Sequence, residues 1–198
     1  MRFFLPLLCS LFLLSSCAHY TEQHPLDLSW SERQHMLSAM MNWQFRGHFA
    51  FKSPQHKLRA NIFWQQNDKN YDISIFGPFG IDAVEILGRP GEVVFKDNHG
   101  KTYHASSPES LLEQQVGWSL PVSSLYYWVR GLPAPGSVTS VQYDVYHRID
   151  VLQQDEWKIQ FVQYTRSAAY ELPQEIIFTH KKDYVHLIIE PTSWQVTH

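Results

Sequence analysis

The sequence predicts an α+β domain: one strongly curved antiparallel sheet of about eleven strands, with three helices on its concave side. Runs of residues with a period of two, separated by turn signals, recur along most of the chain, which is typical of an antiparallel meander. Helix signals are confined to one leading segment and one stretch in the middle, and such segregation favours an α+β architecture. Because a sheet this long tends to curl, we expect an open or half β-barrel whose helices enclose an apolar cavity.

The first element is a predicted helix over residues 29–42. Ser29 and Glu32 have the spacing of a capping box, in which each residue satisfies a backbone N–H of the other. Trp30, Leu37, Met40 and Met41 fall near one stripe at helical spacing, which indicates the face that packs against the sheet.

From Trp43 the period changes to two. Phe45, Gly47, Phe49 and Phe51 alternate with polar or small residues, and residues 57–66 repeat the pattern. We predict further strands at residues 71–76, 82–87, 92–97 and 101–105, with turns at 67–68, 89–91 and 98–100.

Two helices interrupt the strands. Ser107, Pro108 and Glu109 supply a cap, a proline at the first helical position and an acid in the first turn, and Gly117 ends that helix. A second short helix is predicted over residues 122–130, followed by Gly131 and a proline. Strands resume at residues 141–145, 148–152, 156–164, 174–180 and 184–190, and the tail 191–198 is expected to pack as a final edge.

The N-terminus resembles a bacterial lipoprotein signal. A basic residue precedes a run of 12 residues rich in Leu and Phe (residues 3–14), which is too short to span a bilayer. Leu14-Ser15-Ser16-Cys17 resembles a lipobox, so Cys17 is the expected site of lipid attachment, and Ala18 after it favours the outer membrane. The alternative is an ordinary signal peptide with an incidental cysteine. We therefore divide the chain into a signal peptide (1–16), a lipidated N-terminus with a flexible tether (17–28) and one domain (29–198).

Composition excludes several classes of function. The net charge of −3 argues against nucleic acid as a partner. Of the two cysteines, Cys9 lies in the signal peptide, so the mature chain can form no intramolecular disulfide.

We find no catalytic or metal-binding pattern. The stretch from Gly117 to Pro121 begins like a nucleophile elbow, but a proline stands where the last glycine belongs. Eleven histidines are present, yet none has metal-ligand spacing. His180 and His186 could face each other across a hairpin, and exposed cross-strand neighbours are the simpler interpretation. We predict neither an enzyme nor a cofactor.

A set of short motifs in a fixed order resembles the LolB family of outer-membrane lipoprotein receptors. The motifs are Arg46-Gly47-x-Phe49-Ala50, Ile62-Phe63-Trp64-Gln65-Gln66, Gly77-Pro78-Phe79-Gly80, Pro90-Gly91, Asp97-Asn98-x-Gly100 and Pro121-x-x-x-Leu125-x-x-Trp128-x-x-Gly131-Leu132-Pro133. The resemblance covers nearly the whole mature chain. It implies an open β-barrel with an apolar cavity, and a monomeric receptor that accepts lipoproteins from the periplasmic carrier LolA and inserts them into the outer membrane.

The resemblance also assigns a role to the loop Gly77, Pro78, Phe79 and Gly80. The family carries a protruding apolar residue in an Asn-Pro-Leu-Gly loop, and by position that residue is Phe79. Glycine replaces asparagine at Gly77, and phenylalanine replaces leucine. We expect Phe79 to insert into the membrane; the alternative is a ring folded back on a neighbouring strand.

The cavity residues are expected to be apolar, because acyl chains require breadth rather than particular hydrogen bonds. The candidates, which could equally be plain core residues, are Phe49, Phe51, Ile62, Trp64, Ile73, Ile75 and Trp128. Arg46 could hold a helix over the cavity by hydrogen bonds, or it could be an exposed arginine on the outer face. The alternative to the receptor function is a lipid-anchored structural or assembly lipoprotein that binds protein partners, which a fully packed interior would favour.

Overall fold

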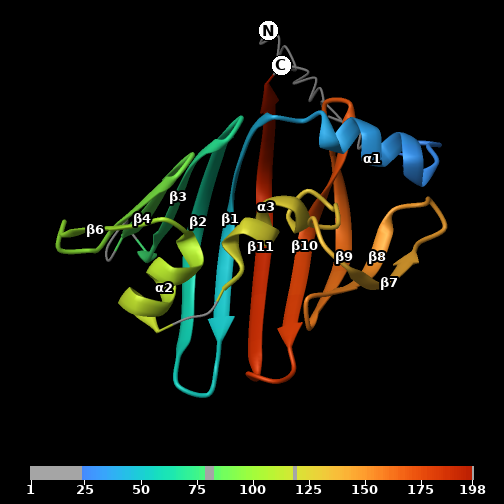
Figure 1. Cartoon of the computed structure of the whole chain (residues 1–198). Coiled ribbons are helices and arrows are strands. Elements are labelled where there is room, and N and C mark those ends of the chain that lie inside the picture. The colour runs from blue at the N-terminus through green and yellow to red at the C-terminus, as the bar shows by residue number, and fades with distance from the viewer. Residues whose placement is uncertain (1–23, 79–82, 118–119, 198) are drawn as a thin grey trace, which may run out of the picture.

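A computed structural model describes residues 24–78, 83–117 and 120–197 and confirms the predicted fold class. The described residues form one antiparallel sheet in the order β6-β5-β4-β3-β2-β1-β11-β10-β9-β8-β7 (Figure 1). Its strands are β1 (Asn42–Lys52), β2 (Lys57–Asn67), β3 (Asn70–Phe76), β4 (Val84–Arg89), β5 (Glu92–Lys96), β6 (Thr102–Ala105), β7 (Val138–Tyr143), β8 (Ile149–Gln154), β9 (Trp157–Ser167), β10 (Tyr170–His180) and β11 (Val185–Thr197). Because β6 and β7 are the two edges and do not pair, the barrel is open.

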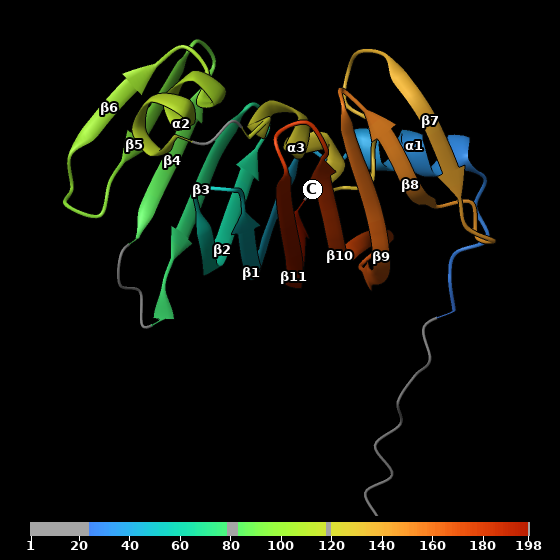
Figure 2. The ribbon, with the colours of Figure 1, turned by 90° about the horizontal axis from the view of Figure 1, so that it is seen from below.

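Three helices lie on the concave face: α1 (Trp30–Ser38), α2 (Pro108–Val116) and α3 (Val122–Trp128). Figure 2 shows the sheet as an arch, with α3 over its centre, α2 near β5 and α1 beside β8. The signals predicted for α2 are present. The Ser107 hydroxyl accepts from the Ser110 N–H at 3.3 Å, and Gly117 ends the helix at φ 69°, a conformation that favours glycine.

Helix α1 is shorter than predicted. The capping box at Ser29 and Glu32 forms, but the helix ends at Ser38, and β1 begins at Asn42. The reason is a tertiary contact: the carbonyls of Leu37 and Met40 both accept hydrogen bonds from Arg130. A side chain about ninety residues away therefore satisfies the helix end.

The centre of the sheet is formed by β1 between β2 and β11. The register of β1 on β11 shifts between Arg46 and Gly47, so the partner sequence skips from Ser193 to Pro191. A Cβ at Gly47 would lie 2.2 Å from the carbonyl oxygen of Glu190, so only glycine fits this approach. The prediction that residues 191–198 form a final edge is wrong, because β11 runs to Thr197 in the middle of the sheet; Pro191 is accommodated at the bulge.

The core lies between the concave face and the helices. Trp43, Phe45, Phe49 and Phe51 alternate with outward-facing residues along β1, as predicted, and are each at most 3% exposed. The Phe45 ring centroid lies 4.8 Å from that of Trp194, which joins the two central strands. Burying each such side chain stabilises the fold by about 1.5–3 kcal/mol. Among the described residues, no helix combines the length and apolar character needed to cross a bilayer.

Candidate functional site

A pocket of about 620 Å³ lies between the β2–β3 hairpin and α3. Its walls are mainly aromatic and aliphatic and its remaining residues polar: Met41, Trp64, Tyr71, Val122, Tyr126, Tyr127 and Pro135, with Gln66, Asp68, Lys69, Ser123 and Ser124. Apolar walls with a few polar groups, at this volume, are typical of sites for small molecules or apolar chains.

Two hydrogen bonds fix the β2 wall of this pocket. The indole Nε1 of Trp64 donates to Oε1 of Gln66 at 3.1 Å. Gln66 in turn donates from Nε2 to the carbonyl oxygen of Asp68 at 2.8 Å. Trp64 and Gln66 are 2% and 4% exposed. The orientation of the indole is therefore set by its own strand and the turn that follows.

Tyr71 forms the wall on β3. Its ring covers Gly88 on the neighbouring strand, where a Cβ would lie 2.1 Å from ring atoms, so glycine makes room for the ring. The Tyr71 hydroxyl is buried and has no hydrogen-bond partner among the described residues. Burial raises the pKa of this phenol, and the nearby Glu109 carboxylate adds to the effect. The hydroxyl thus stays protonated and able to donate.

A second, smaller void of about 30 Å³ lies beneath α2 and α3 and is lined only by hydrophobic side chains. Five predicted cavity residues line it, namely Phe49, Ile62, Trp64, Ile73 and Ile75. Trp64 and Val122 line both this void and the larger pocket.

The other two predicted cavity residues line neither space. Phe51 is 2% exposed, and Trp128, fully buried, donates from Nε1 to Oε1 of Gln154 at 3.0 Å. Both occupy core positions. Contact with acyl chains stays a prediction for all seven residues.

The arginine that holds a helix is Arg130, not Arg46. Arg46 is exposed between the inward-facing Phe45 and Gly47, and its guanidinium lies 4.4 Å from the ring centroid of Phe63 on the outer face. This placement matches the alternative of an exposed arginine, because the strand's alternation turns the side chain away from the helices.

Arg130 is 1% exposed and is held at the end of α3. It donates from Nη1 to the carbonyls of Leu37 and Met40, each at 3.1 Å, and from Nε to the carbonyl of Tyr126 at 3.0 Å. Burial lowers its pKa, which the nearby Tyr126 opposes. Arg130 therefore joins α1 to α3 beside the pocket.

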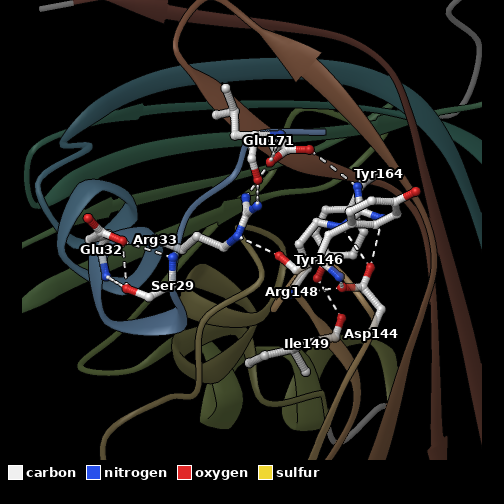
Figure 3. Close-up of polar contacts among 10 residues, drawn as sticks. Ser29, Glu32, Arg33, Asp144, Tyr146, Arg148, Ile149, Tyr164 and Glu171 are labelled. Carbon is white, nitrogen blue, oxygen red and sulfur yellow. Dashed lines mark hydrogen bonds and ion pairs between the residues drawn. The ribbon is translucent and has the colours of Figure 1, made fainter. Parts of the chain in front are cut away.

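A second polar cluster, the N-terminal clamp, consists of Arg33, Asp144, Arg148 and Glu171 (Figure 3). Glu171 forms a buried ion pair with Arg33 and a second pair with Arg148 at 3.3 Å. Arg148 also donates from Nε to Asp144 at 2.7 Å. These contacts tie α1, the β7–β8 turn and β10 together.

The clamp also holds the backbone of Leu26. The Leu26 N–H donates to Glu171 at 3.2 Å, and its carbonyl accepts from Arg33. Leu26 belongs to the segment 17–28 that we predicted as a flexible tether. The last residues of that segment are therefore bound to the domain.

The remaining predicted site residues fall largely outside the described part of the chain. Cys17 precedes it, and Phe79 and Gly80 lie in the gap after Pro78. Gly77 and Pro78 directly follow β3. Lipid attachment at Cys17 and membrane insertion by Phe79 stay predictions.

The histidine pair does not meet. His180 is 8% exposed and lies 3.0 Å from Asp183 and 3.6 Å from Glu156, whereas His186 is exposed and faces Thr179 across the hairpin. The two rings therefore lie on opposite faces, and the exposed-pair interpretation is wrong for His180. No group of three His, Cys, Asp or Glu side chains that could hold a metal ion occurs in the described residues.

Sequence reasoning missed most of the large pocket. Gln66, Tyr126 and Tyr127 line it, yet none was a candidate. The run Tyr126-Tyr127-Trp128 on a short inserted helix was the available signal, because adjacent aromatic residues on a helix cannot all face the core.

Comparisons with known proteins agree with this architecture. The family model described as outer membrane lipoprotein LolB matches residues 41–194. Proteins named outer-membrane lipoprotein LolB from Pseudomonas syringae pv. syringae (strain B728a) and Pseudomonas paraeruginosa (strain DSM 24068 / PA7) are both 37% identical to this chain. The first covers 92% of this chain and 91% of the relative, and the second 94% and 92%.

Solved structures share the fold at low identity. A LolA superfamily protein from Nitrosomonas europaea matches with a TM-score of 0.56 at 9% identity, covering 86% of this chain and 94% of that one. A DUF1329 family protein from Desulfovibrio piger matches with a TM-score of 0.51 at 8% identity, covering 84% and 90%. The extent of the family match and of the 37% identity shows that this chain belongs to the LolB family of outer-membrane lipoproteins.

Proposed function

We propose that this protein is a receptor, anchored to the outer membrane by a lipid on Cys17, that accepts lipoproteins from the periplasmic carrier LolA and inserts them into that membrane. Membership of the LolB family and a fold shared with a LolA superfamily protein support the role. The observation that carries it is the pocket of about 620 Å³ beside the hydrophobic interior. This pocket offers space for acyl chains next to the side chains that would solvate them.

The energetics suit a transfer without nucleotide. Each CH₂ of an acyl chain removed from water contributes about 0.8 kcal/mol, so an apolar pocket holds such a chain firmly. Directed transfer then requires affinity to rise from carrier to receptor to membrane. The polar rim of Asp68 and Lys69, both exposed, leaves one side of the pocket in contact with water, which would limit how tightly cargo is held.

Phe79 is proposed to act in the delivery step. Burying one phenylalanine contributes about 1.5–3 kcal/mol, far less than the acyl chains on Cys17, so the loop cannot be the anchor. A brief insertion that brings the pocket to the bilayer fits this magnitude.

The test is transfer of a fluorescently labelled lipoprotein from LolA to this protein, with and without the Cys17 lipid, followed by delivery to liposomes. Both forms are expected to accept cargo. Phe79→Glu is expected to fold and accept cargo but to lose delivery at least 10-fold, whereas Phe79→Leu, which keeps an apolar tip, delivers. Failure of the wild type to accept cargo contradicts the receptor function, and normal delivery by Phe79→Glu contradicts the role of the loop.

A second candidate function is an assembly lipoprotein that binds protein partners. The small size of the inner void, about 30 Å³, favours it, because a nearly filled interior leaves little room for acyl chains beneath the helices. The same assay separates the two: a protein-binding module would retain the non-acylated form of the lipoprotein as well as the acylated form.

A further inference from the structure

The large pocket and the small inner void are separate spaces that share one wall. Trp64 of β2 and Val122, the first residue of α3, line both. The remaining lining of the inner void consists of aliphatic residues and Phe49, with no polar side chain. The direct route from the pocket into the hydrophobic interior therefore lies between Trp64 and Val122.

The two sides of this wall are held differently. On the sheet side, Trp64 is fixed by its hydrogen bond to Gln66, which is fixed by its own bond to the Asp68 carbonyl. On the helix side, α3 starts at Pro121, which provides no side-chain cap. The start of α3 is instead joined to α2, because the Ser123 N–H donates to Glu109 Oε1 at 2.8 Å.

Gln66 is placed where it can set the orientation of the Trp64 indole. Gln66 is buried and lines the pocket directly beside Trp64. Its amide oxygen accepts the hydrogen bond from the Trp64 indole. Among the described residues this bond is the single polar restraint on a ring that otherwise makes ring contacts with Trp43 and Phe45. Such aromatic contacts survive a small rotation, whereas a hydrogen bond is lost when its geometry changes.

From this geometry we infer that Trp64 and Val122 form a gate between the outer pocket and the hydrophobic interior, and that Gln66 is the positioning residue that holds the gate closed. The ligand class is a long acyl chain, so the inference rests on the proposed function. A chain whose extended length is short enough to lie wholly in the outer pocket leaves the gate closed. A long chain displaces the indole, which breaks the bond to Gln66, and its end occupies the enlarged inner void.

The test compares fluorescent fatty-acid probes with eight-carbon and sixteen-carbon chains, whose association rates are measured by stopped flow. Gln66→Leu removes the acceptor for the indole. It is expected to accelerate association of the sixteen-carbon probe about 2- to 10-fold, the effect of one net hydrogen bond, and to leave the eight-carbon rate unchanged. Gln65→Leu is the matched control, since Gln65 is the adjacent glutamine on the outer face and lines neither of the two spaces.

A second variant keeps the inference testable if Gln66→Leu does not fold. Trp64→Phe removes the indole donor, while the bond from Gln66 to the Asp68 carbonyl remains possible. Trp64→Phe is expected to accelerate the long probe, because it removes the bond and also makes the gate ring smaller. Adding Gln66→Leu to Trp64→Phe should give no further acceleration, because the bond is already absent.

The outcomes separate the two levels of the proposal. Equal effects of Gln66→Leu on both probes, no effect on either, or full additivity in the double variant overturns the gate while leaving the receptor function in place. If the wild type binds neither probe, the proposed function fails and the gate with it.

Discussion

The two halves of the sheet differ in how many of their buried polar groups lack a hydrogen-bond partner. In the half formed by β7–β11, the N-terminal clamp pairs every buried charge that it contains, and the Tyr164 hydroxyl donates to the Ile149 carbonyl at 2.6 Å. In the half formed by β1–β6, the Trp43 indole nitrogen, the Tyr71 hydroxyl and an oxygen of Asp72 are buried without a hydrogen-bond partner among the described residues. In the other half, Nδ1 of His180 also lacks a hydrogen bond, although it lies 3.0 Å from Asp183. The large pocket lies in the β1–β6 half.

This difference indicates that the two halves of the sheet have different roles. A fully paired polar cluster specifies one arrangement, because breaking any member leaves another charge buried. Unpartnered groups and voids cost stability, and one such group, the Tyr71 hydroxyl, belongs to a residue that lines the pocket where a ligand is proposed to enter. We therefore expect the β7–β11 half to keep one arrangement and the β1–β6 half to adjust when a ligand binds.

Glu171→Gln is expected to have the largest effect, because it leaves Arg33 buried without its carboxylate. We expect a loss of about 3–5 kcal/mol in the free energy of unfolding, measured by urea denaturation. Faster hydrogen exchange at the Leu26 amide, which donates to Glu171, would locate the change. Glu85→Gln is the control; its pair with Lys96 is exposed and should cost less than about 1 kcal/mol. Equal losses of stability in Glu171→Gln and Glu85→Gln would mean that the buried clamp contributes no more than an exposed ion pair.

Arg130→Met tests the connection between α1 and α3. It removes three hydrogen bonds to carbonyl groups, so we expect a loss of about 2–4 kcal/mol in the free energy of unfolding. Arg46→Met, which removes only the exposed contact with Phe63, should cost less than about 1 kcal/mol. A larger loss for Arg46→Met would revive the helix-holding role first predicted for Arg46.

Removal of one tyrosine hydroxyl should have opposite signs in the two halves. Tyr164→Phe breaks the bond to Ile149 and should destabilise by about 1–2 kcal/mol. Tyr71→Phe removes a hydroxyl without a described partner and should be neutral or stabilise by up to about 1 kcal/mol. Thermal unfolding of both variants checks the signs, and a clear loss in Tyr71→Phe would mean that its hydroxyl has a partner after all.

Asp72→Asn should have the smallest effect, and it depends on pH. Burial, together with the nearby Glu85, raises the pKa of Asp72. A raised pKa in the folded state favours the protonated acid, so its contribution to stability is present at low pH and lost as pH rises through the folded pKa. Asp72→Asn should therefore stabilise at pH 7 by less than about 1 kcal/mol, since the group is partly exposed, and this gain should vanish near pH 4. A stability gain of Asp72→Asn that grows at low pH would contradict a raised pKa for Asp72 in the folded state.

The elements that the sequence predicted correctly are those with local causes. The cap, proline and terminal glycine of α2 act within one segment, and so does the alternation of β1. The tail was mispredicted because Pro191 reads locally as a strand end, whereas the bulge opposite Gly47 lets β11 continue. Cys17 was predicted from the lipobox-like stretch, and the role of Phe79 from the resemblance to the LolB family; neither followed from periodicity.

The clamp and Arg130 could not be predicted from local patterns. Glu171 is 138 residues from Arg33, and Arg130 is 93 residues from Leu37. A single charged residue in a strand or at a helix end looks the same whether it is solvated or paired with a distant partner. The pocket was only partly predicted for the same reason, because α3 and the β2–β3 hairpin meet only in the folded chain.

The clamp on Leu26 limits how far the domain can lie from a membrane that holds a lipid on Cys17. With Cys17 as the predicted anchor, 26 − 17 = 9 residues separate the lipid from the fixed point on the domain. Fully extended, a tether of this length reaches about 30 Å at most, which is less than the diameter of about 40 Å expected for a domain of this size. The domain would then stay next to the bilayer that anchors it, and a carrier would have to bring its cargo to the membrane surface.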